Sequence, residues 1–145
     1  MKQLFFGLLF LLFSGVLHAQ QGRNALGIRF SNNDALVNTG ISFRHYVKSS
    51  TAIEGTLSFD PAAVGILVEK FKPLGSPGLN WFYGGGGYVA FSGRNVLGAQ
   101  GIIGLDYTFS AAPINVSLDW KPELELLNDV SFEPAAVGLG IRFTF

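Results

Sequence analysis

An alternation of large apolar residues with small or polar ones runs through almost the whole chain after residue 20. It restricts the fold more than any other feature. The last eleven residues, AAVGLGIRFTF, show it most clearly. On one side of an extended strand they place Val137, Leu139, Ile141, Phe143 and Phe145. A period of two is typical of β-strands, whereas an amphipathic helix repeats every 3.6 residues. The sequence therefore predicts an all-β chain whose strands have two unlike faces.

Eight alternating segments are separated by turn residues. They cover residues 24–31, 40–47, 51–60, 63–71, 80–91, 96–109 and 114–123, and the C-terminal segment. Linkers such as VKSST, FSGRN and FSAAP are short enough for hairpins, so we expect consecutive strands to be antiparallel neighbours.

A set of eight charged residues within the predicted strands lies in the phase opposite the large apolar residues. They are Arg29, Arg44, Glu54, Glu69, Asp106, Asp119, Lys121 and Arg142. The rest of this face is mostly glycine, serine, threonine and asparagine. A soluble barrel would need a well-charged exterior, yet charged residues make up 14% of the chain, against about 25% in soluble domains. The pattern favours a transmembrane barrel whose narrow lumen holds these charges as ion pairs.

Strands of this length cross a bilayer when tilted, and a membrane barrel must close because unpaired edges are costly in hydrocarbon. We therefore predict an eight-stranded antiparallel up-and-down transmembrane β-barrel with short hairpin turns and a lumen filled by side chains. With both termini periplasmic, two aromatic belts are predicted. The periplasmic belt comprises Trp81, Tyr83, Tyr107, Phe109, Phe143 and Phe145, and the outer belt comprises Phe30, Phe59, Phe91 and Trp120.

The N-terminus predicts export. Residues 1–19 combine Lys2, an apolar run from Leu4 to Leu17 and a small residue at Ala19, the layout of a cleaved signal peptide. An uncleaved membrane anchor is the alternative. Residues 20–145 then form the barrel domain. The chain has no cysteine, which excludes disulfides, and its ten basic and ten acidic residues give no basic stripe for nucleic acid.

A short repeat suggests a pairing across the lumen. FDPAAVGI (59–66) and FEPAAVGL (132–139) precede the fourth and eighth predicted strands, which lie opposite each other in an eight-stranded barrel. Extending the repeat aligns Glu69 with Arg142 and predicts an ion pair between them. The alternative is that similar strand entries simply need similar turns.

Several segments together resemble the small outer-membrane β-barrel proteins of Gram-negative bacteria. They are the terminal GLGIRFTF and the stretches GLNWFYGGGGYVAF, GIIGLDYTF and INVSLDWKPELEL, and the resemblance covers most of residues 22–145. It implies an outer-membrane location in contact with lipid. It also implies that the barrel-assembly machinery reads the terminal strand ending at Phe145, and that the protein is a monomer. The outward loops are expected to be shorter than in many relatives.

Other motifs favour structural interpretations. YGGGGY (83–88) lacks the lysine of a phosphate loop, so its glycines are expected to bend the strand or to make room for Phe82 and Tyr88. His45 is predicted to be interfacial and non-catalytic. No metal or cofactor is expected. The favoured function is a non-enzymatic structural or surface-interaction role in the envelope. A lipid-modifying hydrolase, a small channel and a soluble periplasmic lipocalin-like ligand-binding barrel remain as alternatives.

Overall fold

The computed structural model describes residues 22–32, 39–127, 130–134 and 136–145. The predicted signal peptide, residues 1–19, lies outside the described residues. The strands are β1 (Asn24–Ser31), β2 (Gly40–Lys48), β3 (Thr51–Phe59), β4 (Ala62–Pro73), β5 (Leu79–Ser92), β6 (Arg94–Thr108), β7 (Ile114–Trp120), β8 (Glu123–Glu125), β9 (Ser131–Glu133) and β10 (Val137–Thr144). In the part of the chain so described, no helix has the length and apolar character needed to cross a membrane.

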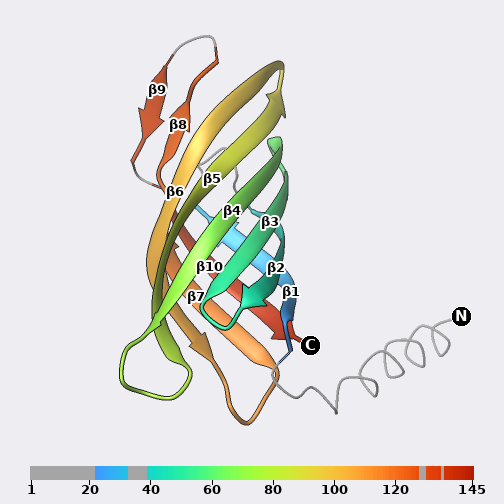
Figure 1. The fold of residues 1–145 in the computed structure, drawn as a ribbon. Helices are drawn as coiled ribbons and strands as arrows, with labels where there is room; N and C mark the ends of the chain where they lie inside the picture. The colour runs from blue at the N-terminus through green and yellow to red at the C-terminus, as the bar shows by residue number, and fades with distance from the viewer. Residues whose placement is uncertain (1–21, 33–38, 128–129, 135) are drawn as a thin grey trace, which may run out of the picture.

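Strands β1–β7 and β10 form a closed antiparallel barrel (Figure 1). Strands β1 to β7 pair in chain order, β7 pairs with β10, and β1 closes the ring by pairing with both β2 and β10. At this seam Asn24 and Phe145 exchange two backbone hydrogen bonds of 3.1 and 2.9 Å. The predicted eight-stranded antiparallel barrel is thus confirmed. Closure satisfies the edge groups that an open sheet would leave unpaired.

The predicted seventh strand was too long, and the loop that follows it is not short. β7 ends at Trp120, and after Pro122 the chain continues as β8, which pairs with residues 98–100 of β6. β9 pairs with β8, so the β8–β9 hairpin projects beyond the barrel (Figure 1). Proline has no N–H to donate to a ladder and redirects the chain at this point.

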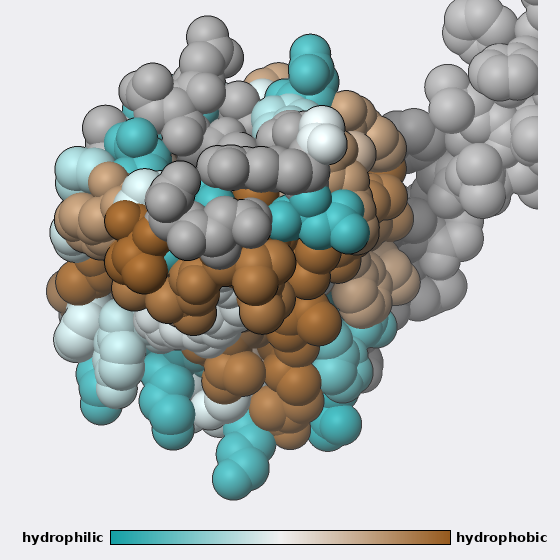
Figure 2. All heavy atoms as spheres, turned by 90° about the horizontal axis from the view of Figure 1, so that it is seen from above, coloured by the Kyte–Doolittle hydropathy of each residue, from teal (hydrophilic) through white to brown (hydrophobic). Residues whose placement is uncertain are grey.

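We name the two barrel ends by their contents. The termini end carries Asn24, Phe145 and the turns after β2, β4 and β6, and the hairpin end carries β8 and β9. Most large apolar side chains of the strands point outward, and in the view from the hairpin end apolar residues cover much of the visible wall (Figure 2).

The interior holds charged side chains together with two apolar clusters. One cluster comprises Ala52, Leu67, Phe71, Phe82 and Ile102, and the other comprises Ala63, Tyr88, Ala90 and Val96.

Gly98 makes room for the buried Tyr88 ring. The two residues are direct partners across β5 and β6, and a Cβ atom at Gly98 would overlap the ring atoms of Tyr88. Two glycines of the YGGGGY stretch, Gly84 and Gly86, lie close to β4 instead. A Cβ atom at Gly84 would overlap the carbonyl oxygen of Val68, so this part of β5 lies too close to β4 for a side chain.

Gly98→Val is expected to lower the free energy of unfolding by about 1–3 kcal/mol, because a side chain is forced into filled space. Denaturant titration of the refolded protein measures the change. Ala99→Val is the matched control, since Ala99 faces the opposite side of the same strand. The loss should shrink in a Tyr88→Ala background. An equal loss for both valine variants would contradict this steric explanation.

Candidate functional site

Three buried residues form the centre of the lumen. Arg142 Nη2 lies 3.0 Å from both carboxylate oxygens of Glu54, and Arg44 Nη2 lies 3.1 Å from Glu54 Oε2. All three side chains are almost completely shielded from solvent. Arg142 also donates to Ser42 Oγ and Ser117 Oγ, each at 2.8 Å. The carboxylate of Glu54 therefore pairs with two guanidinium groups, one from β2 and one from β10.

Arg44 reaches further acids on the side towards the termini end. Its Nε lies 2.9 Å from Glu69 Oε2, and its Nη1 donates to Asp106 Oδ1 at 2.8 Å. Its guanidinium carbon also stands 5.0 Å from the ring centroid of Phe71 and 5.4 Å from that of Phe82. Buried ion pairs need such additional contacts, because desolvation of the charges is expensive.

The predicted Glu69–Arg142 ion pair is wrong. Glu69 pairs with Arg44, and Arg142 pairs with Glu54. The register gives the reason. From Arg142 the ladder runs through Gly27 and Ser42 to Thr56 on β3, whereas Glu69 lies opposite Ala52 on the same strand. Glu54 lies between these two positions, so its carboxylate is the one that Arg142 reaches.

A second set of ion pairs fills the hairpin end of the lumen. Arg29 and Asp119 form a double hydrogen bond of 2.7 and 2.5 Å. Lys121 Nζ lies 3.6 Å from Glu123 Oε1 and donates to Gln100 Oε1 at 3.3 Å. The structure thus places all eight predicted lumen charges inside the barrel. Glu123 was not among the predicted lumen charges, although it continues the alternation of Asp119 and Lys121.

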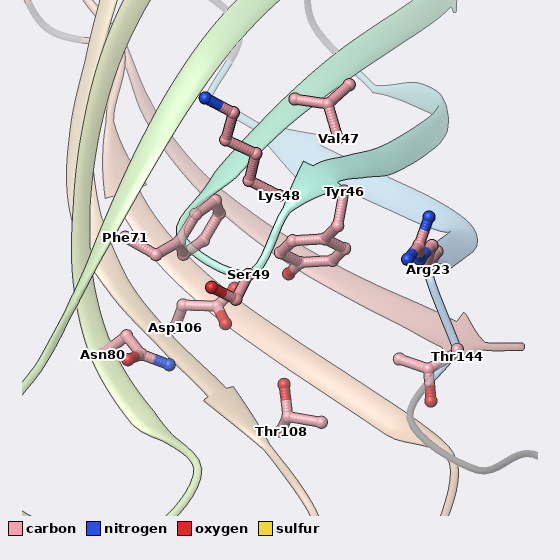
Figure 3. A pocket seen from close by; sticks show the side chains of 11 residues that line it. Arg23, Tyr46, Val47, Lys48, Ser49, Phe71, Asn80, Asp106, Thr108 and Thr144 are labelled. Atoms are coloured by element: carbon pink, nitrogen blue, oxygen red, sulfur yellow. The ribbon is translucent and has the colours of Figure 1, made fainter.

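A cavity of about 500 Å³ opens at the termini end. Tyr46 and Phe71 form its aromatic side, with ring centroids 5.4 Å apart, and Asp106 lies at its inner end (Figure 3). Arg23 and Lys48 are exposed and also line it. Side chains therefore fill the lumen at the level of Arg44, as predicted, whereas the termini end of the lumen contains a cavity.

The predicted belts and terminal strand lie on the outer surface. Trp81 and Tyr83 stack at 5.3 Å, and Tyr107 and Phe109 meet edge to face at 4.8 Å, all towards the termini end. Exposed side chains towards the hairpin end include Phe59, Phe91 and Trp120. The terminal strand exposes Val137, Leu139, Ile141, Phe143 and Phe145.

His45 is exposed near the seam, and its Nδ1 lies 2.8 Å from Asn24 Oδ1. Among the described residues, no three His, Asp or Glu side chains gather in an arrangement that would hold a metal ion. Comparison with models of known protein families finds no match to this chain, and a search of curated proteins finds no significant relative. The functional proposal therefore rests on the fold and the side-chain arrangement.

Proposed function

We propose that the protein is an integral outer-membrane β-barrel with a non-enzymatic role in the structure or surface interactions of the cell envelope. One observation carries the proposal: most large apolar side chains of the barrel are exposed, while nine charged side chains are buried. Ile28, Ile66 and Leu118, for example, are 51, 57 and 54% exposed, whereas Arg44 and Glu69 are fully buried.

Such a surface suits lipid better than water. Soluble proteins rarely expose continuous apolar patches of more than a few hundred square ångströms, and a larger patch marks a membrane or protein contact. Here the apolar surface follows the strands around a closed barrel, which leaves no backbone edge to hydrocarbon. Aromatic side chains at both ends of the strands fit the two membrane interfaces.

The lumen favours a structural role over catalysis. Its charged groups are engaged with one another across β1, β2, β3, β6, β7 and β10, so they hold the wall together. His45, the residue on which a hydrolase would depend, bonds to an asparagine side chain. The proposal further includes cleavage of the signal peptide near residue 19 and recognition of the terminal strand by the assembly machinery.

Membrane fractionation followed by electrophoresis in SDS tests the proposal. We expect the protein in the outer-membrane fraction, with a different mobility before and after boiling, because a closed barrel resists cold SDS. The boiled sample is the control for the unfolded chain. Recovery from the soluble periplasmic fraction without a mobility shift would overturn the proposal and favour a soluble ligand-binding barrel.

A further inference from the structure

The β8–β9 hairpin has two chemically different faces. Two rows of paired residues face the lumen side, namely Gln100, Glu123 and Glu133 in one and Gly98, Glu125 and Ser131 in the other. The row between them consists of Ala99, Leu124 and Phe132 and faces the opposite side. Neighbouring rows of a sheet point to opposite faces, so one face of the hairpin is acidic and the other is apolar.

The apolar face continues the outer wall of the barrel. Leu97 and Ala99 belong to β6, a barrel strand, and Leu124 and Phe132 extend their face sideways onto the hairpin. Phe132 is 59% exposed and Val130, two residues before it, is 75% exposed. No charged residue lies in the row from Ala99 to Phe132.

Contacts on both sides fix which face points outward. On the lumen side, buried Glu123 pairs with Lys121. On the outer side, the indole N–H of Trp120 donates to the carbonyl oxygen of Pro134, just after β9. A slip of one residue would turn the glutamates outward and break these contacts.

The height of the hairpin matches the apolar band. Tyr107 lies near the termini end of β6, and Ala99 is eight residues away along the same strand. At the usual rise and tilt of a barrel strand, this spacing corresponds to about 20 Å along the barrel axis. The apolar band of a membrane barrel is about 25 Å tall. On β6, Ala99 lies between Ile103, which pairs with Trp120, and Asn95, which pairs with Phe91. The row from Ala99 to Phe132 therefore begins at the outer aromatic belt, at the edge of the band.

We propose that the apolar face of the hairpin contacts lipid at the outer interface of the membrane, so that β8 and β9 belong to the lipid-facing surface. This inference rests on the proposed function. Lipid is the occupant because the face is continuous with the barrel wall and carries no charge that would select a protein partner.

Site-directed spin labelling tests this placement. The chain has no cysteine, so single cysteines can be introduced into the full mature chain and labelled with a nitroxide. The labelled barrel is refolded into phosphatidylcholine vesicles, and collisions with oxygen and with a water-soluble nickel chelate are measured. Phe132→Cys reports on the apolar face and Ser131→Cys on the acidic face. Leu118→Cys is the control for the barrel wall, and Ser76→Cys, in the exposed turn after β4, is the control for water.

We expect Phe132→Cys to lie closer to Leu118→Cys than to Ser76→Cys, with a higher oxygen and a lower nickel collision rate than the water control, and Ser131→Cys to match Ser76→Cys. If Leu118→Cys is in lipid but Phe132→Cys collides freely with nickel, the hairpin inference is overturned while the proposed function stands. If Leu118→Cys is also in water, the proposed function fails as well. Val130→Cys answers the same question should Phe132→Cys not refold, and the cold-SDS mobility shift verifies folding of each variant.

Discussion

Replacing Arg44 by glutamine is expected to lower the free energy of unfolding by about 3–5 kcal/mol, because it leaves buried acids without their cation. Arg44 is the partner of Glu69 and Asp106 and shares Glu54 with Arg142. Its contacts with the rings of Phe71 and Phe82 are lost as well. All three carboxylates are buried, and Asp106 alone among them borders the cavity at the termini end.

Denaturant unfolding of the barrel refolded in detergent or vesicles measures this loss. Arg23→Gln is the matched control, because Arg23 is exposed at the mouth of the cavity, and it should change stability by no more than about 0.5 kcal/mol. The double variant Arg44→Gln/Glu69→Gln removes one of the acids that lost its cation, so it should be more stable than Arg44→Gln alone. Wild-type stability of Arg44→Gln alone would mean that the lumen charges are solvated rather than paired.

The second large effect is expected at Glu54, with a pronounced contrast to Glu69. Glu54→Gln should cost about 3–5 kcal/mol, because Arg142 then loses its carboxylate partner and stays buried. Glu69→Gln should cost less than about 1 kcal/mol, because Arg44 keeps Glu54 and Asp106. This cluster contains three acids and two arginines, so one acid can be neutralised while both arginines keep a carboxylate partner.

The two glutamine variants are each other's control, since residue type, burial and chemical change are the same. Parallel unfolding curves, with folding verified by the cold-SDS shift, give the comparison. A larger loss for Glu69→Gln than for Glu54→Gln would contradict the pairing seen in the lumen and would favour the Glu69–Arg142 pair suggested by the repeat.

Local pattern was sufficient to predict the strands and their faces. The predicted 24–31 segment has the bounds of β1, and the alternation places Arg29, Arg44 and Arg142 on the interior face. This works because a strand has a period of two, so neighbouring residues alone decide which side chains share a face. It failed after Trp120, where the alternation continues through Lys121 to Glu123 although the chain leaves β7 and starts a new strand.

The sequence by itself therefore determined an all-β chain of eight main strands with one apolar and one polar face. Only the tertiary structure decided which charges meet, namely Arg142 with Glu54 and Arg44 with Glu69 and Asp106. It also decided that the termini end is hollow and that β8 and β9 extend β6. Contacts across the lumen depend on the register of every strand around the closed ring. Register is a property of the whole barrel, and alternation along one strand does not encode it.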